Sequence, residues 1–285
     1  MAVSFRIQQD RVSLEIPACF GASSSDTTPR TPSPADKLGM KAQFMQKSKR
    51  NPAEIIEVYD KALELDGNHA ANIGNYALFL CTTCSQMDQA ELYFKRALDV
   101  DPANAKNLAN YGNFLRCVRK DFPASEACYK RAMDAAPNDV GILGGYADLL
   151  AAKESGDAQN LEMARKLLEK ALGIHPTHTR NRLRLAMVLS NLEDNEEADR
   201  CFKALLASVS QQKANDNQIK QETLVSIYGN YASFLFRRGQ WARAKHLYDK
   251  AVKVDPQHPW LLRNFSCFLR ESRQVLSPRG ETTAL

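Results

Sequence analysis

NYALFL, residues 75–80, recurs in variant form at five further places in this chain: NYGNFL at 110–115, GYADLL at 145–150, RLAMVL at 184–189, NYASFL at 230–235 and NFSCFL at 264–269. In each copy the apolar residues lie three and four positions apart, as they do on one face of an α-helix. The sequence therefore predicts a helix of one kind, repeated six times along the chain.

A second segment follows most copies and ends at a proline: AELYFKRALDVDP from Ala90, SEACYKRAMDAAP from Ser125, ARKLLEKALGIHP from Ala164 and AKHLYDKAVKVDP from Ala244. A degenerate copy, IIEVYDKALELDG from Ile55, precedes them all. Successive copies lie about 35 residues apart, with longer steps of 39 and 46 later in the chain. Because proline cannot continue a helix, each unit is predicted to be two antiparallel helices.

The joint pattern resembles the tetratricopeptide repeat, which has a small residue in the first helix, Ala-x3-Phe/Tyr-x2-Ala in the second and a proline at the end. The resemblance covers roughly residues 52–273, with departures at Gly67, which replaces the proline, and Leu185, which replaces the tyrosine. It implies an all-α, right-handed superhelical solenoid of antiparallel helix pairs, with about five to six units. The first helix of each unit is then expected to line a concave groove.

Three parts are expected along the chain. Residues 1–50 are predicted to be a largely disordered arm, because GASSSDTTPRTPSPAD (21–36) is rich in Ser, Thr and Pro and poor in large apolar side chains. Residues 51–273 form the repeat domain, and residues 274–285 form a flexible tail. The polar insertion at 207–222 either makes a protruding loop or lengthens the two helices beside it.

Composition limits the function classes. The net charge of +5 is small for a nucleic-acid-binding protein. No apolar run approaches the roughly 20 residues that cross a bilayer, and residues 1–16 have no signal-peptide core. We therefore expect a soluble, cytoplasmic protein, with the nucleus as the alternative. Seven scattered cysteines, including the Cys81/Cys84 pair, are expected to be reduced thiols that contribute to packing.

The sequence predicts no enzyme. It contains no phosphate-binding loop, HExxH or GxSxG motif, and its five histidines belong to no recognisable catalytic arrangement. The segments outside the repeats are also too short to fold an active site. We accordingly expect no cofactor, no metal ion and no small-molecule substrate.

Asparagine recurs at one position of the first helices, at Asn75, Asn110, Asn230 and Asn264. Two interpretations stay open. The amides could hydrogen-bond neighbouring helices and set the superhelix, or they could bind the backbone of an extended peptide in the groove.

The groove-facing positions are rich in basic residues, and the predicted partner-binding set is Asn75, Lys106, Asn110, Asn113, Arg116, Arg180, Arg184, Asn230, Arg237, Arg263, Asn264 and Arg270. In the chaperone-docking proteins of this family, Lys and Asn clamp a partner's C-terminal carboxylate. Asn113, Arg180 and Arg184 fall on three of those positions, whereas Ala109 and Gly145 leave the clamp incomplete.

The predicted function is a scaffold or adaptor that binds an extended or helical acidic segment of another protein. The alternative is a helical-repeat RNA-binding protein, suggested by the period and the groove arginines. Residues Thr28, Thr31, Ser33 and Ser277 each precede a proline and are candidate phosphorylation sites, although a plain Pro-rich linker explains them as well. If phosphorylated, the arm could occupy the basic groove itself.

Overall fold

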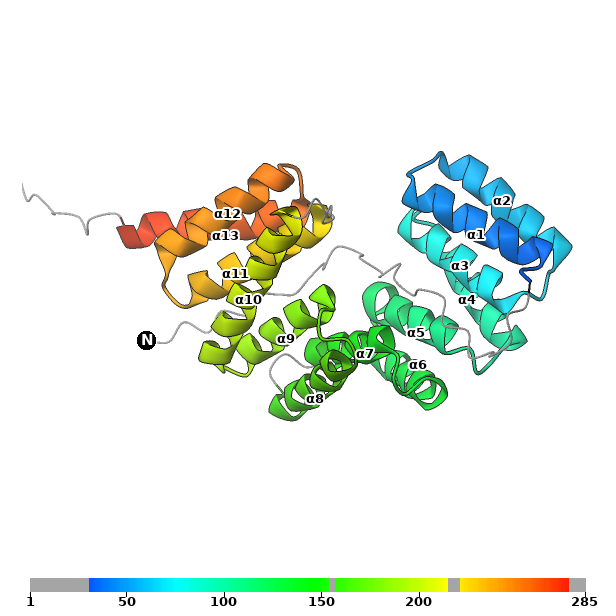
Figure 1. Ribbon diagram of the computed structural model, residues 1–285, viewed down its shortest axis with the longest axis horizontal. Helices are drawn as coiled ribbons and strands as arrows, with labels where there is room; N and C mark the ends of the chain where they lie inside the picture. The colour runs from blue at the N-terminus through cyan, green and yellow to red at the C-terminus, as the bar shows by residue number, and fades with distance from the viewer. Residues whose placement is uncertain (1–30, 154–156, 215–220, 277–285) are drawn as a thin grey trace, which may run out of the picture. The chain divides into compact units, whose positions relative to one another are not determined.

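The computed structural model describes residues 31–153, 157–214 and 221–276, and all regular structure in these ranges is helical (Figure 1). The chain divides into two compact units. The helices of the N-terminal unit are α1 (Pro34–Lys47), α2 (Pro52–Leu65), α3 (Ala70–Thr82), α4 (Met87–Val100), α5 (Ala105–Phe114), the π-helical turn η1 (Leu115–Arg119), α6 (Phe122–Ala135), α7 (Val140–Ala152) and α8 (Ala158–Ile174). The helices of the C-terminal unit are α9 (Thr179–Asn191), α10 (Asn195–Ala214), α11 (Gln221–Arg237), α12 (Trp241–Val254) and α13 (Pro259–Leu276).

Consecutive helices pack in pairs, and the pairs stack. In the N-terminal unit α1 packs on α2, α3 on α4, α5 on α6 and α7 on α8; in the C-terminal unit α9 packs on α10 and α11 on α12. The first helices also pack on one another, α1 on α3, α3 on α5 and α5 on α7 in one unit, and α9 on α11 and α11 on α13 in the other. In each unit the first helices therefore form a layer of their own, whose surface we call the first-helix face. The all-α fold of antiparallel helix pairs is confirmed.

The helices of a pair approach closely because alanine lies where they touch. Ala97 of α4 and Ala132 of α6 are fully buried, and an aromatic side chain three residues earlier, Phe94 or Tyr129, fills the space beside each of them. The Ala-x3-aromatic-x2-Ala pattern thus describes a packing surface: the small side chains allow contact between backbones and the ring supplies most of the buried apolar area.

The described turns from a second helix to the next first helix are closed by side-chain hydrogen bonds. The carboxylate of Asp101 accepts the backbone N–H of Ala103 at 3.2 Å, an Asx turn that suits the proline between them. The first helix is then capped by Asn104, whose side chain accepts the N–H of Asn107. His69, His178 and His258 occupy the same capping position and accept through Nδ1. These three histidines are helix caps, a role that the sequence analysis did not assign.

A carboxylate on the second helices ties one pair to the next. In α6 Glu126 accepts the Tyr146 hydroxyl of α7 at 3.3 Å and pairs with Lys130 at 2.8 Å and with Lys153. Glu91 of α4 makes the equivalent bond with the next tyrosine of its unit, Tyr111. A tyrosine in a first helix is therefore matched by an acidic residue in the preceding second helix.

The predicted start of the repeat domain at residue 51 is wrong. Helix α1 covers residues 34–47, which were assigned to a disordered arm, and it packs on α2 and α3. Ser33 and Asp36 form a capping box at its start, and the small residues Ala35, Gly39 and Ala42 allow close contact with its neighbours. Helix α1 is thus the first helix of the first pair. The rest of the predicted arm, residues 1–30, lies outside the described residues.

The insertion at 207–222 lengthens the flanking helices over its described part. Helix α10 continues to Ala214 and α11 begins at Gln221, whereas residues 215–220 lie outside the described ranges. At the C-terminal end α13 runs to Leu276, three residues beyond the expected boundary at 273. Within the described residues, no helix combines the length and the apolar character needed to cross a membrane.

Candidate functional site

Helix α5 carries the densest group of predicted groove residues. Lys106, Asn110 and Asn113 are four and three positions apart, so they lie on one stripe of the helix. The neighbouring first helices α3 and α7 flank α5 on either side. Asn110 is 2 % exposed and Asn113 is 5 % exposed, which means that these polar side chains are almost entirely removed from water.

Arg116 joins this stripe from the π-helical turn η1. Its Nη2 donates to the amide oxygen of Asn113 at 2.8 Å, and the thiol of Cys117 lies 3.5 Å from the same oxygen. The amide oxygen of Asn113 is therefore satisfied within the chain, and the amide N–H groups are the part left to bind something else. A π-turn is often found at functional positions of helices.

Buried polar atoms without a hydrogen-bond partner concentrate at the predicted groove residues. Among the described residues such side-chain atoms are Tyr59 Oη, Asn110 Nδ2, Asn113 Nδ2, Arg116 Nε and Arg180 Nη1. The last four belong to residues predicted from sequence to face the groove, and all four are N–H donors. Because unpaired buried donors are rare in native proteins, the three on α5 and η1 make this part of the first-helix face the candidate site.

The charge of Lys106 fits the same site. Burial lowers the pKa of its ammonium group, Asp139 acts in the opposite direction, and Lys47 acts in the same direction as burial. An anion placed close to Lys106 would favour the charged form, because opposite charges attract strongly where water is excluded.

Asn75 lies half-buried on α3, one repeat before Asn110. A second asparagine of the same helices has a different role that the sequence analysis missed. Asn72 donates from Nδ2 to the carbonyl oxygen of Ala35, and Asn107 donates to that of Ala70, both at 2.9 Å. These amides join consecutive first helices and are structural.

The asparagines that join the helices fit only because glycine lies opposite. A Cβ atom on Gly39 would lie 1.9 Å from Oδ1 of Asn72, and one on Gly74 would lie 2.0 Å from Oδ1 of Asn107. Both pairs are separated by 33 residues. The recurrence of glycine and asparagine at that separation is the sequence signal that could have revealed the contact.

The first-helix face of the C-terminal unit carries the other predicted residues. Arg180 and Arg184 lie on α9, one turn apart; Nη1 of Arg180 is buried and unpaired, whereas Nη1 of Arg184 donates to Oδ1 of Asn181 at 2.9 Å. Asn113 lies in the other unit, so the three clamp-like residues are divided between the units.

The remaining predicted residues differ in their surroundings. Asn230 donates from Nδ2 to the carbonyl oxygen of Ser226 in its own helix at 2.7 Å, which satisfies the amide internally. Arg237 is exposed and donates to Ser190 Oγ at 2.8 Å. Asn264 is half-buried, and two arginines of α13 are exposed, Arg263 and Arg270.

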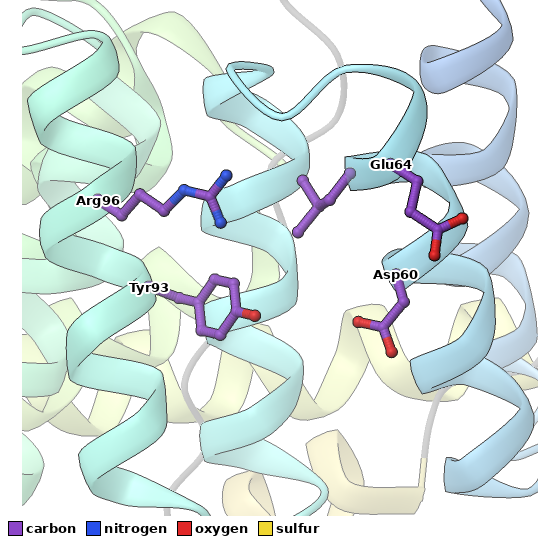
Figure 2. A pocket seen from close by; sticks show the side chains of 5 residues that line it. Asp60, Glu64, Tyr93 and Arg96 are labelled. Atoms are coloured by element: carbon purple, nitrogen blue, oxygen red, sulfur yellow. The ribbon is translucent and has the colours of Figure 1, made fainter.

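The second helices of the N-terminal unit carry a hollow of about 380 Å³ between α2 and α4 (Figure 2). Asp60 and Glu64 of α2 face Tyr93 and Arg96 of α4 across it, and Leu63 of α2 also lines it. Nη2 of Arg96 donates to the carbonyl oxygen of Gly67 at 2.6 Å, which ties α4 to the preceding turn. The hollow is open and shallow, and the donor-rich face on α5 remains the stronger candidate.

The cysteine pair in α3 and the turn after it fits the packing role expected from sequence. Cys81 is buried with its Sγ 3.5 Å from Sδ of Met87, and burial raises its pKa to about 12. Burial also raises the pKa of Cys84. Both groups are therefore thiols at neutral pH rather than reactive thiolates.

Two candidate phosphorylation sites can be placed. Thr31 is exposed just before α1, and Ser33 is the N-cap of α1, where its Oγ accepts the N–H of Asp36 at 3.1 Å. Thr28 and Ser277 lie outside the described residues.

Comparison with known sequences gives no relative: no family profile and no curated protein matches the chain. Solved structures do match. PilW, a widely conserved type IV pilus biogenesis factor, aligns with a TM-score of 0.62 at 17% identity, covering 80% of this chain and 97% of that chain. TTC0263, a thermophilic TPR protein of Thermus thermophilus, aligns with a TM-score of 0.59 at 19% identity, covering 70% of this chain and 99% of that chain.

PilF of Pseudomonas aeruginosa aligns with a TM-score of 0.58 at 17% identity, covering 83% of this chain and 97% of that chain. At such identities the likeness concerns the fold alone. The helix pairs, their alanine and aromatic contacts and the period near 35 residues agree with it. The chain has the tetratricopeptide-repeat fold.

Proposed function

We propose that this protein is an interaction scaffold that binds an acidic, extended or helical segment of another protein on its first-helix face. The observation that carries the proposal is the group of unpaired N–H donors at Asn110, Asn113 and Arg116, beside the half-buried Lys106. The proposal requires no catalytic residue.

The chemistry of these atoms defines the ligand. A buried donor without an acceptor destabilises the free protein by about 1–3 kcal/mol, and a ligand that supplies an acceptor removes that penalty. Carboxylates and main-chain carbonyls are the acceptors that a protein segment offers. Because the donors include a guanidinium group and lie near an ammonium group, a carboxylate gains more from them than a neutral carbonyl does.

Arg180 and Arg184 extend the proposal to the C-terminal unit. Arg180 has an unpaired buried Nη1 there, and its neighbour one turn later supplies a second guanidinium group on the same helix. Two arginines on one helix turn suit bidentate binding of an acidic side chain. A partner segment with several Asp or Glu residues matches this surface in charge.

Charge reversal tests the proposal. Full-length protein and the Arg116→Glu and Arg180→Glu/Arg184→Glu variants are immobilised and exposed to native cell extract, and the retained proteins are identified by mass spectrometry. We expect the wild type to retain proteins with acidic segments and both variants to lose them, with unchanged helical circular dichroism. The control is Lys61→Glu, which makes the same change of charge on the exposed side of α2.

RNA is the alternative ligand, and the salt dependence of binding distinguishes it from an acidic protein segment. Binding of an acidic segment to these half-buried cations weakens moderately as salt screens the charges. Binding of single-stranded RNA falls more steeply, with a logarithmic slope of about 0.7 for each phosphate contacted. A steep slope with RNA and no retention of acidic proteins would replace the scaffold by an RNA-binding protein. Full retention of the acidic proteins by the arginine variants would exclude the first-helix face as the binding surface.

A further inference from the structure

Phe44 of α1 is 69 % exposed, although the equivalent side chain of each later first helix is buried. The exposed fractions of the equivalents are 0% for Phe79, 0% for Phe114, 0% for Leu149, 4% for Val188, 2% for Phe234 and 2% for Phe268. One core position of the repeat is thus uncovered at one end of the N-terminal unit.

The cause is a missing partner ring. Phe79 lies 5.8 Å, centroid to centroid, from Tyr59 of the preceding second helix, and Phe114 lies 5.5 Å from Phe94 of the preceding second helix. In the described part of the chain no second helix comes before α1, so Phe44 has no such ring to pack against.

The rest of this edge is not built for another complete repeat. Lys37 and Lys41 are exposed on α1 at the positions where α3 has the buried side chains Asn72 and Tyr76. Charged residues are typical of the capping surface of a repeat array. Met40, which lies between the two lysines in the sequence, is 51 % exposed. The uncovered surface is therefore a small apolar patch with cations next to it.

The size of the patch decides what can cover it. Two partly exposed side chains offer on the order of 200–300 Å², whereas a stable interface between separate proteins needs about 800 Å² from each partner. A second copy or an independent protein would not hold to this patch alone. A segment joined to α1 has an effective concentration in the millimolar range, so a weak contact is enough to keep it bound.

Residues 3–20, VSFRIQQDRVSLEIPACF, contain large apolar residues that suit this patch, among them Phe5 and Ile7. Their charged residues are Asp10 and Glu15 with Arg6 and Arg11, so the segment has no net charge and its two carboxylates are the groups that suit the lysines. The linker at 21–32 can span about 40 Å when extended, whereas Phe44 lies only about 16 Å along the helix from Ser33. The segment can reach the patch.

We propose that residues 3–20 dock on the edge of α1 formed by Met40 and Phe44 and complete the N-terminal end of the repeat domain. The apolar side chains cover the ring of Phe44, and the carboxylates lie close to the ammonium groups of Lys37 and Lys41. This docking is independent of the function proposed for the first-helix face.

Photo-cross-linking of the full-length chain tests the proposal. With Phe44→p-benzoylphenylalanine, irradiation should give cross-links within one chain to residues 3–20, in a yield that does not change on about tenfold dilution because the contact is intramolecular. The same probe at Leu92 of α4, which is 66 % exposed, serves as the matched control and should not cross-link to this segment.

A second variant identifies the side chains responsible. Phe5→Ser/Ile7→Ser should remove most of the cross-links at position 44 while leaving the melting of the helices unchanged, because both residues lie outside the described helices. Cross-links to another copy of the chain, cross-links to other segments only, no cross-links to residues 3–20, or a yield unaffected by the double substitution would each overturn the proposal.

Discussion

Asn110 and Asn230 occupy the same place in the NYxxFL hexapeptide, one in each unit, and differ in what their amides do. In the N-terminal unit Asn110 is 2 % exposed and its Nδ2 has no partner, whereas in the C-terminal unit Asn230 donates to its own helix. A repeat position thus determines where a side chain lies, but the side chain's role depends on the acceptors around it. Under the proposed function, the unsatisfied donor of Asn110 is the one that a partner would bind.

The units also differ in how successive first helices contact one another. In the N-terminal unit Asn107 reaches across to the Ala70 carbonyl over Gly74. In α11 and α13 of the C-terminal unit the same repeat position is apolar, at Ile227 and Leu261, and Gly229 instead makes room for the ring of Trp260. The contact between α3 and α5 thus uses a buried hydrogen bond where the contact between α11 and α13 uses apolar packing, and glycine permits close approach in both.

The largest effect is expected at Gly74. Gly74→Ala places a Cβ 2.0 Å from Oδ1 of the buried Asn107, so either the amide bond to Ala70 breaks or α3 and α5 separate. We expect a loss of about 2–3 kcal/mol in the free energy of unfolding, measured by urea denaturation. The control is Gly173→Ala in α8, whose Cβ would meet no atom within 4 Å and which should be neutral or stabilising.

The double variant Gly74→Ala/Asn107→Ala sharpens this test. Removal of the amide makes room for the new methyl group, so the double variant should lose less than the sum of the two single losses. Additive losses would show that the clash lies elsewhere.

The next effect separates two asparagines three residues apart on α5. Asn107→Ala removes the bond to the Ala70 carbonyl and should destabilise the protein by about 1–2 kcal/mol. Asn110→Ala removes an amide whose Nδ2 has no partner in the chain, so the loss should stay below about 0.5 kcal/mol while partner binding falls. Thermal denaturation and the extract experiment measure the two properties. An equal loss of stability would make Asn110 structural.

Sequence reasoning was most successful where the residue pattern repeats. The hexapeptides and the Ala-x3-aromatic-x2-Ala segments recur, so periodicity alone predicts the helix pairs. It failed at α1, because Lys37 and Lys41 replace the usual apolar and amide side chains at the end of an array and hide the repeat. The cue was the Ser33-x-x-Asp36 capping box, which lies within the Ser/Thr/Pro-rich stretch.

For the site, sequence identified the helix positions but not the pairing. The positions of Asn110, Asn113 and Arg116 followed from the repeat register. Which amide is free depends on side-chain rotamers and on the π-turn that places Arg116 beside Asn113. Neither the rotamers nor the π-turn has a simple sequence signature, because a helix can accommodate the extra residue of a π-turn at several positions.

A smaller effect is expected from pH in the N-terminal unit. Hydrogen bonds from Lys130 and Lys153 lower the pKa of Glu126 to about 2, from 4.5 in the unfolded chain. The unfolded chain therefore binds the proton more tightly, so this stabilisation is complete above pH 4.5 and declines as the pH falls toward about 2.

Glu126→Gln tests this contribution. The melting temperature of the wild type should fall more steeply below pH 4.5 than that of the variant. The corresponding difference in the free energy of unfolding should be no more than about 1 kcal/mol, because the ion pairs of Glu126 lie near the surface. The gap between the two proteins should close toward pH 2. Parallel curves across this range would mean that Glu126 does not tie α6 to α7.

Small effects are also expected in the turns from a first helix to its second helix. Lys120 in the N-terminal unit and Glu193 in the C-terminal unit have φ values of 58° and 62°, and Gly239 has 69° at the same place in the next turn. Residues with a Cβ are disfavoured in this left-handed conformation, whereas glycine adopts it freely but loses more chain entropy on folding. Lys120→Gly and Glu193→Gly should therefore each stabilise their unit by a net amount on the order of 0.5 kcal/mol, and Gly239→Ala should destabilise its unit by about 1 kcal/mol.

Chemical denaturation measures all three variants. Opposite signs for glycine gained and glycine lost would show that backbone strain, rather than side-chain contact, governs these turns, and a loss of stability in Lys120→Gly would instead assign a contact to the lysine side chain.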